Sequence, residues 1–405
     1  MTTAGALDGV RVLDLSRVLA GPWSTQILGD LGADVVKVER PGAGDDTRGW
    51  GPPFVGADGG GDAAYFLVAN RNKRSVAIDF TTPEGAEIVR RLAAQAHIVV
   101  ENFKTGGLAK YGLDYPSLKT INPALVYCSV TGFGQTGPYA QRAGYDYLVQ
   151  AMGGLMSVTG QPAGTPGGEP MKVGVAVADL FAGMYAVTGI LAALRHAERT
   201  GEGQHIDIAL LDAQVAMLAN QAQNFFATGQ APIRLGNAHP NIAPYQVFAA
   251  SDGHIVLAVG NDGQFASFCR VASLEALAAD ARFATGAARV AHRAELISEI
   301  ASVMRARSAA DWIAALEAAG VPCGPINDVA GVFDDPQVKA RGLAQSMRRD
   351  DGVEVRMTAS PLRLSVTPPR ADLAPPALGA HTDEVLATLG YSEADISGLR
   401  ARGIV

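Results

Sequence analysis

Asp179 is the only acidic or basic residue between Lys172 and Arg195, and it lies in the apolar stretch VGVAVADLFAGMYAVTGILAAL. Burial of an unpaired carboxylate is so costly that this side chain must be neutralised, paired or used in chemistry. A carboxylate in such surroundings can act as a nucleophile toward an activated carbonyl. Three other roles compete with this one: a helix N-cap, an acceptor for buried backbone amides, and an interruption of a membrane segment.

The membrane role fits the sequence poorly. The stretch is long enough to span a bilayer, but it is rich in Ala and Gly, carries a central acid and has no second segment like it. The beginning of the chain, MTTAGALDGVRVLDL, lacks the basic flank, apolar core and small-residue cleavage site of a signal peptide. We therefore expect a cytoplasmic protein without a membrane partner.

The composition narrows the class of function. The chain has 405 residues, a formal net charge of −7 and no block rich in Lys or Arg. The length indicates two domains, and the charge argues against a nucleic-acid partner but still allows a local basic pocket for an anionic ligand. Cys128, Cys269 and Cys323 are far apart and odd in number, which favours a reducing compartment. The histidines and cysteines form no metal-binding array, so no metal site is expected.

Strand and helix signals alternate over residues 10–130. Strands are expected at 10–15, 34–39, 75–80, 97–101 and 125–130, and helices at 22–31 and 83–95, the latter capped by Thr82 or Thr81. This β-α-β alternation predicts an α/β, Rossmann-like domain with a mainly parallel sheet covered by helices.

A further helix is expected from about Asp179 to Arg199, after a Gly- and Pro-rich segment at 159–170. Asp179 would then lie at the helix start, where backbone N–H groups and the helix dipole favour the charged carboxylate while desolvation opposes it. A poorly hydrated but ionised carboxylate is what attack on a carbonyl requires.

The pattern of strand, helix and loop signals in the sequence changes after Phe226. We expect a large α/β domain formed by residues 1–226 and 336–405. The chain would return to this domain after a smaller α+β domain at 227–335.

Several groups along the predicted sheet could bind an anion. The first βα turn, LSRVLAGP, lacks the G-x-G-x-x-G fingerprint, which argues against a nicotinamide dehydrogenase. Arg40 ends the second strand and is a candidate phosphate contact. The cluster RNKR, which ends in Arg74, could form a basic rim with Arg40 and Lys110, or could be an exposed basic loop. Asn102 and Phe103 end another strand, where ligands bind in open α/β sheets.

Several blocks of the sequence, taken in order, resemble the class III CoA-transferases of the CaiB/BaiF type, the family of formyl-CoA transferase and carnitine CoA-transferase. The resemblance covers essentially the whole chain. The blocks are LDLSRVLAGP at 13–22, LGADVVKVERPGAGDDTRGW at 31–50, NRNKRS at 70–75, VENF at 100–103, ADLFAGMYA at 178–186, GVPCGPIND at 320–328 and LGAHTDEVL at 378–386. GPPFVG at 51–56, YCSVTGFGQTGPYAQRAGYD at 127–146 and HPNIAPYQVF at 239–248 look most like the succinate–hydroxymethylglutarate (glutarate) CoA-transferases.

The resemblance implies that Asp179 is the nucleophile. In this family the aspartate attacks an acyl-CoA to give a mixed anhydride, which CoA thiolate converts into an aspartyl-CoA thioester. The acceptor acid then takes the CoA by the reverse steps. Coenzyme A is a substrate and product, and no tightly bound cofactor is implied. The implied function is CoA transfer from a succinyl-CoA-like donor to a free carboxylic acid, in particular a dicarboxylate.

Other site residues are carried over position by position. Arg40 would contact the nucleotide phosphates of CoA, and Asn102, Phe103 and Lys110 would line its nucleotide and pantetheine path. Lys110 stands where formyl-CoA transferase has an arginine, so the charge is kept but the bidentate geometry is lost. Leu19 stands where that enzyme has a glutamine, and this departure argues against a formyl or oxalate specificity. The remaining candidates are Arg74, Leu19 and Tyr145 for CoA, His239 and Tyr145 for the acyl group, and Arg17, Arg142 and Arg234 for a distal carboxylate.

The family also implies a homodimer of two interlocked chains. One alternative of the same fold is a 2-methylacyl-CoA racemase. Racemases carry Gly-His-Asp where this chain has Gly144-Tyr145-Asp146, and a neutral tyrosine is a poor base near pH 7. A CoA- or NADP-binding protein without acyl transfer is the other alternative, and in it Asp179 would be structural.

Overall fold

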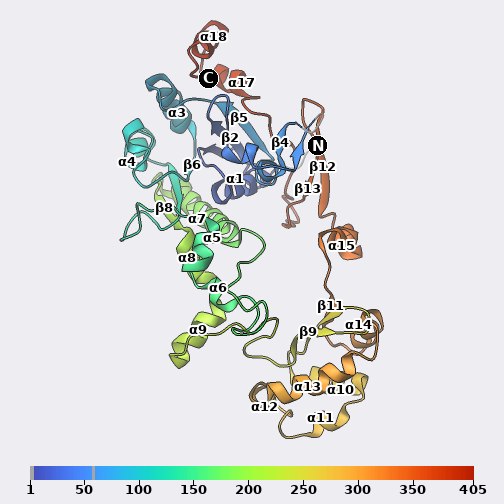
Figure 1. Ribbon diagram of the computed structural model, residues 1–405. Coiled ribbons are helices and arrows are strands. Elements are labelled where there is room, and N and C mark those ends of the chain that lie inside the picture. Colours follow the sequence, from blue (N-terminus) through green and yellow to red (C-terminus); the bar gives the residue numbers. More distant parts are fainter. Residues whose placement is uncertain (1–3, 57–59) are drawn as a thin grey trace. The chain divides into compact units, whose positions relative to one another are not determined.

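The computed structural model describes residues 4–56 and 60–405 and divides into two compact units. The first unit consists of Met1–Leu155, Val173–Gln223 and Pro336–Val405, and the second of Met156–Lys172 and Asn224–Asp335. In Figure 1 the C-terminal helices, in red, rejoin the unit that holds the N-terminal strands, in blue. The second unit also takes in residues 156–172, which the sequence did not set apart from the first.

Six parallel strands in the order β5-β2-β1-β6-β7-β8 form the sheet of the first unit. Their bounds are Lys73–Ala77 (β5), Asp34–Glu39 (β2), Arg11–Asp14 (β1), Ile98–Glu101 (β6), Val126–Thr131 (β7) and His205–Ala209 (β8). The chain runs outward from β1 to β5 on one side and from β6 to β8 on the other. Ligands bind at such a reversal of strand order, beyond the carboxyl ends of the strands.

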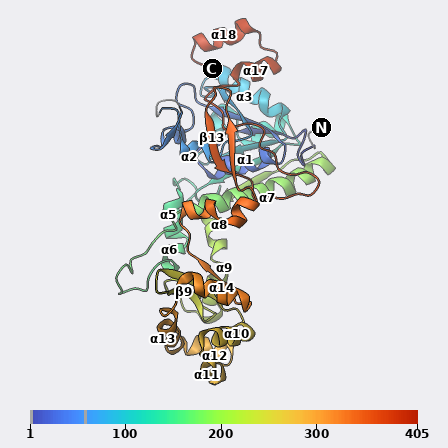
Figure 2. The same ribbon diagram turned by 90° about the vertical axis from the view of Figure 1, so that its right-hand side faces the viewer.

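Both faces of the sheet are covered, because alternate residues of each strand point to opposite sides. Leu13 and Val36 pack on the face that carries α3 (Pro83–Gln95), α4 (Tyr115–Ile121), α17 (Thr382–Thr388) and α18 (Glu393–Ala401). Val12 and Val35 pack on the face that carries α1 (Ala20–Asp30), α5 (Asp146–Met152), α7 (Val177–Thr200) and α8 (Leu210–Met217). Figure 2 shows α3, α17 and α18 on one side of the sheet and α1, α7 and α8 on the other. The α/β fold with a parallel sheet, to which the chain returns, is therefore confirmed.

Among the described residues, α7 is the one helix long and apolar enough to cross a membrane. Its small residues form a buried stripe at helical spacing, with Ala178, Ala182 and Ala186 packed in the same core as α1 and the sheet. The helix starts at Val177, so Asp179 lies in its first turn as expected.

The second unit contains three antiparallel strands in the order β11-β10-β9, at Cys323–Pro325, His254–Ala258 and Tyr245–Ala249. Its core gathers Phe248, Leu257 and Trp312. Its helices are α10 (Asp262–Ala272), α11 (Glu275–Ala279), α12 (Gly286–Ala291), α13 (Arg293–Met304), α14 (Ala309–Ala318) and α15 (Val329–Asp334).

Short elements complete the chain. Two hairpins pair β3 (Phe54–Val55) with β4 (Asp62–Ala63) and β12 (Ala344–Arg348) with β13 (Glu354–Thr358). The remaining helices are α2 (Ala64–Leu67), α6 (Leu155–Val158), α9 (Ala219–Thr228) and α16 (Pro336–Ala340), with 3-10 turns at Asp46–Gly49 and Ala109–Tyr111.

The RNKR cluster corrects one expectation. The strand expected at 75–80 begins at Lys73, and the cluster is not an exposed loop. The Lys73 ammonium is fully buried and lies 3.0 Å from Asp14, while Arg71 pairs with Asp30 at 2.5 Å. These charges can be buried because each meets an acid that is distant in the sequence, and no local pattern reveals such a pairing.

Candidate active site

A pocket of about 580 Å³ opens in the first unit, at the carboxyl ends of β1, β2, β6 and β7. This is the edge at which the strand order reverses. The pocket brings together the following residues named from the sequence: Arg17, Leu19, Arg40, Asn102, Phe103, Lys110, Arg142, Tyr145 and Asp179.

Asp179 reaches the pocket from the first turn of α7. No hydrogen bond to its carboxylate is found within residues 4–56 and 60–405, so its oxygens are available to a ligand. Asp146 lies beside it, because its Oδ1 accepts the Ala178 N–H at 2.8 Å. The buried Gln150 holds the second oxygen of Asp146 through a hydrogen bond of 2.7 Å. Asp146 therefore occupies the place of an N-cap, and Asp179 is left unpaired.

The electrostatic surroundings of Asp179 raise its pKa to about 7. Burial is the larger cause, and the neighbouring Asp146 carboxylate adds to it. Among the described residues no cation offsets these two effects, whereas the buried Asp14 is paired with Lys73. A carboxyl group that titrates near neutrality is a more basic nucleophile than an ordinary aspartate and still ionises at cellular pH.

Tyr65 in α2 belongs to the same electrostatic neighbourhood. Burial raises the pKa of its phenol, and the charges of Asp179 and Asp146 raise it further. The phenol therefore stays protonated beside these two carboxylates. Its ring packs edge-to-face against Trp50, with the centroids 5.3 Å apart.

The loop between β1 and α1 forms one wall of the pocket. Asn102 at the end of β6 holds this loop, since its Oδ1 accepts the Arg17 N–H at 2.9 Å and its Nδ2 donates to the Arg17 carbonyl at 2.6 Å. The side chain of Asn102 is thus already used within the protein. The Arg17 guanidinium pairs with Asp46 at 2.8 Å and lies over the Phe103 ring at 5.2 Å.

Exposed cations surround the mouth of the pocket. Within the described ranges, no acid pairs with Arg40, Lys104, Lys110 or Arg142. The Arg142 guanidinium lies 4.5 Å from the Tyr139 ring centroid and 5.3 Å from that of Phe133. An aromatic wall faces the same space, formed by Phe80, Phe103 and Tyr111 in edge-to-face contact. This lining suits a polyanion that also carries an aromatic group.

Three candidates do not line this pocket. Arg74 pairs with Asp34 at 2.6 Å and with Glu384 at 2.8 Å, at the far edge of the sheet on β5. Arg234 and His239 belong to the second unit. There Arg234 donates to the Gln161 and Gly168 carbonyls. The His239 ring accepts the Asn241 N–H at 3.1 Å, and burial followed by Arg293 lowers its pKa, so the ring is neutral at pH 7.

Other residues enter the site only through the structure. Lys104 directly follows the recognised VENF block, and a basic residue after a strand end was a signal that could have found it. Asp146 was visible next to Tyr145, but its contact with the start of α7 joins residues that are thirty-two positions apart in the sequence. Tyr65 carried no signal in the sequence. No cluster of three or more His, Cys, Asp or Glu side chains suited to a metal occurs in the part of the chain that the structure describes.

Comparisons with known proteins bear on this site. The model of CoA-transferase family III matches residues 7–382. A succinate–glutarate CoA-transferase of Agrobacterium fabrum is 55% identical over 385 residues, which cover 95% of each chain. The human succinyl-CoA:glutarate CoA-transferase is 42% identical over 406 residues, covering 100% of this chain and 91% of the human protein. The crystal structure of a CaiB/BaiF family protein from Brucella suis has a TM-score of 0.84 at 53% identity, covering 95% of this chain and 100% of that one.

Replacing Asp179 by Asn is expected to stabilise the protein, increasingly so as the pH rises from about 4 to about 8. The unfolded carboxyl titrates near 3.8 and the folded one near 7. Between these values the folded state holds a proton that the unfolded state has released, so the unfolding free energy of the wild type falls with pH. The Asn variant lacks this fall. Urea unfolding of both proteins across the pH range measures the difference.

A stability difference that does not change with pH would contradict the raised pKa. Asp212→Asn is the matched control, because Asp212 is also in the first turn of a helix, α8, but is exposed. Its stability difference from the wild type should not grow over the same range.

Proposed function

We propose, from the premise that the chain belongs to CoA-transferase family III, that it carries CoA from succinyl-CoA to glutarate or a dicarboxylate of similar length, with Asp179 as the nucleophile. Membership of the family makes the chain a CoA-transferase. The acid pair is inferred from the names of its relatives. The observation that carries the mechanism is an unpaired carboxylate with a pKa near 7 in a pocket whose mouth is basic.

The first half of the reaction moves CoA onto the enzyme. An Asp179 oxygen attacks the thioester carbonyl, the C–S bond breaks, and CoA leaves as a thiolate from an aspartyl–succinyl anhydride. The thiolate then attacks the carbonyl carbon of Asp179, the C–O bond of the anhydride breaks, and succinate leaves. The enzyme is left as an aspartyl-CoA thioester.

The second half returns CoA to a new acid. The acceptor carboxylate attacks the aspartyl-CoA carbonyl and expels the thiolate, which forms a second anhydride. The thiolate attacks the acceptor's acyl carbon, releasing the new acyl-CoA and the Asp179 carboxylate. One thioester is exchanged for another without net uptake of water or protons, so the reaction needs no nucleoside triphosphate.

Each attack places negative charge on a carbonyl oxygen. The position of the start of α1 indicates which backbone N–H groups donate hydrogen bonds to that oxygen. Gly183 of α7 faces Ala20, and a Cβ on this glycine would lie 2.8 Å from the Ala20 carbonyl oxygen. Asp179 lies one turn before Gly183 on the same side of α7. The first N–H groups of a helix have no intrahelical acceptor, which favours the amides that begin α1 as donors to the oxyanion.

The pocket mouth supports CoA as the ligand. Arg40, Lys104 and Lys110 are exposed cations suited to the phosphates of CoA, and Phe103 offers an aromatic surface to the adenine. Lys110 lies 4.7 Å from the Tyr111 ring centroid, which places its charge beside the same aromatic wall. The apolar lining beyond the mouth suits the pantetheine arm and limits the access of water to the anhydride.

Arg142 is the best-supported partner for the distal carboxylate of a dicarboxylate. It lines the pocket, stacks on aromatic rings and has no acid partner in the described chain, whereas Arg17 is already paired with Asp46. Planar guanidinium groups bind carboxylates through two hydrogen bonds, which gives selectivity as well as affinity.

The racemase alternative has weaker support. Its acid–base histidine is replaced by Tyr145, which lines the pocket but is 64% exposed and carries no basic group. The relatives with assigned acids are named as CoA-transferases.

The nucleophile is tested with a panel of acyl-CoA donors and free acids. Asp179→Ala is expected to lower CoA transfer by at least about a thousandfold, because both covalent intermediates are lost. Hydroxylamine added to wild type turning over succinyl-CoA should convert Asp179 to a hydroxamate, seen by peptide mass. Asp212→Ala is the control and should keep full transfer. Full activity of the Asp179 variant would rule out the mechanism.

Arg142→Gln is expected to raise the KM for dicarboxylate acceptors by about tenfold to a hundredfold, because a charge-assisted contact is lost. The KM for a monocarboxylate such as butyrate should change little. Arg17→Gln is the matched comparison and should have the smaller effect on dicarboxylates. Equal losses with mono- and dicarboxylates would assign Arg142 to another part of the substrate.

A homodimer is expected as well. Large apolar side chains stand exposed on α7 and α5 of the first unit: Phe181 at 46%, Tyr185 at 46% and Tyr147 at 61%. Such faces are usually covered by a partner, and a second copy is what the family resemblance implies. Light scattering should give twice the chain mass of 42.0 kDa. A monomer mass would overturn this proposal and leave the chemistry at Asp179 untouched.

A further inference from the structure

Val18, in the loop between β1 and α1, has a left-handed backbone conformation with a φ of 70°. This is unfavourable for a β-branched residue, because its side chain crowds the following carbonyl oxygen. Such a conformation persists only where the surroundings hold it in place. Val18 stands between Arg17 and Leu19, and all three line the pocket.

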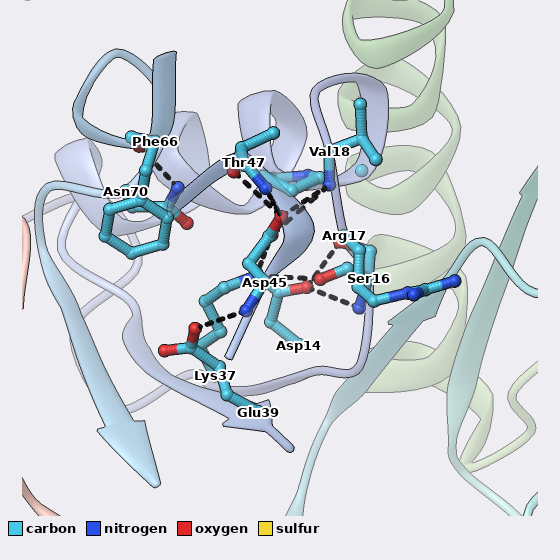
Figure 3. Close-up of polar contacts among 12 residues, drawn as sticks. Asp14, Ser16, Arg17, Val18, Lys37, Glu39, Asp45, Thr47, Phe66 and Asn70 are labelled. Carbon is cyan, nitrogen blue, oxygen red and sulfur yellow. Dashed lines mark hydrogen bonds and ion pairs between the residues drawn. The ribbon is translucent and has the colours of Figure 1, made fainter. Parts of the chain in front are cut away.

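Asp45 holds the backbone of Val18 (Figure 3). Both carboxylate oxygens accept the Val18 N–H, each at 3.2 Å. Oδ1 also accepts the N–H and hydroxyl of Thr47, at 3.0 and 2.8 Å, and Oδ2 lies 3.0 Å from the Lys37 ammonium. The carboxylate is therefore fully engaged inside the protein, with no exposure of its side chain.

Lys37 holds the same loop from β2. Its Nζ donates to the Ser16 carbonyl at 2.8 Å and pairs with Asp45. The other acids nearby have cations of their own, since Asp14 pairs with Lys73 at 3.0 Å and Glu39 pairs with Arg48 at 2.6 Å. Asp45 is thus the carboxylate available to Lys37, and the pair connects two successive peptide groups of the loop.

The loop leads directly into the part of α1 that faces the nucleophile. Ala20 is the first residue of α1, and it packs against Gly183, one turn beyond Asp179. An ordinary, negative φ at Val18 would turn the chain in a different direction before α1. Leu19 and the first amides of the helix, which line the pocket together with Asp179, would then be displaced from it. Asp45 lines the pocket, but because its oxygens are occupied it acts on this backbone and not on the substrate.

We propose that Asp45 and Lys37 are positioning residues for CoA transfer, which hold Val18 in its left-handed conformation and so keep the start of α1 aligned with Asp179. The proposal rests on the proposed function, because the start of α1 is positioned relative to Asp179 as the nucleophile. It predicts that the requirement for Asp45 depends on the residue at position 18. Glycine adopts a positive φ without strain and needs less restraint.

The test is a double-mutant cycle of Asp45→Asn and Val18→Gly in the full-length protein. Asp45→Asn should lower kcat by about tenfold to a hundredfold, because small displacements of reacting groups have effects of that size. Its KM for succinyl-CoA should change by less than about threefold, since the cations at the mouth are untouched. Adding Val18→Gly to Asp45→Asn should recover at least about tenfold in kcat.

Asp30→Asn is the matched control. It also removes a buried, paired carboxylate, but at the other end of α1. There Asp30 pairs with Arg71 and accepts a hydrogen bond from Asn72, and it does not line the pocket. It should lose stability without losing kcat. Amide hydrogen exchange of the peptide 15–20 should accelerate in Asp45→Asn and not in Asp30→Asn, and this readout does not require turnover.

Two results would overturn the proposal: Asp45→Asn with kcat within twofold of wild type, or a double variant no more active than Asp45→Asn. Unchanged amide exchange of the peptide 15–20 in Asp45→Asn would also overturn the proposal. This result would count even if the wild type transferred no CoA, because exchange does not require turnover. Failure of the proposed function looks different, because it shows as an active Asp179→Ala variant or as no hydroxamate at Asp179.

Discussion

The side chains of Lys37 and Lys73 are fully buried although they lie beneath the wall of a pocket. Removing an ammonium from water is so costly that only well-placed carboxylates and carbonyl oxygens can offset it. The partners are Asp45 and Asp14, each at 3.0 Å, and the carbonyl oxygens of Ser16 and Pro22. These carbonyls belong to the first βα loop and to α1. The pairing of two buried lysines therefore determines where the backbone of the pocket wall lies, and every contact with a ligand at that wall depends on it.

The same desolvation acts on two aspartates with opposite results. Burial tends to raise the pKa of Asp14, but Lys73 and Lys37, together with hydrogen bonds from the Ser16 and Thr25 hydroxyls, outweigh it and bring the pKa to about 2. Burial also raises the pKa of Asp179, and the neighbouring Asp146 carboxylate raises it further, to about 7. Asp14 is therefore a permanent counter-ion, while Asp179 is a basic carboxylate without a partner. The environment, and not the residue type, separates the structural acid from the reactive one.

Periodic parts of the fold could be predicted from the sequence. The helix at 83–95 lies as predicted, and of its two candidate caps, Thr82 and Thr81, the cap is Thr82. The strand at 34–39 and the start of α7 also lie where local pattern placed them. The sequence failed where distant charges meet, as at Lys73, whose strand start was read as a loop. The short β8 strand and the β12–β13 hairpin were also missed. In the site, Asp179, Arg40, Asn102, Phe103 and Lys110, which the resemblance named, line the pocket. The neighbour that raises the pKa of Asp179 depends on a contact between the first turns of α5 and α7 that no spacing reveals.

The small residues that make α7 resemble a membrane span have a different cause. A Cβ at Gly183 would lie 2.8 Å from the Ala20 carbonyl oxygen and 3.1 Å from the Trp23 ring, so only glycine allows α1 and α7 to approach this closely. A glycine inside a helix lowers helix stability by about 1 kcal/mol relative to alanine, but here it allows the two helices to approach closely. Larger side chains would separate the two helices and leave Asp179 facing water, where its pKa would return toward 3.8. The lone acid and the small residues around it thus serve one requirement: a partly buried carboxylate, with no counter-ion among the described residues, beside the first amides of a neighbouring helix.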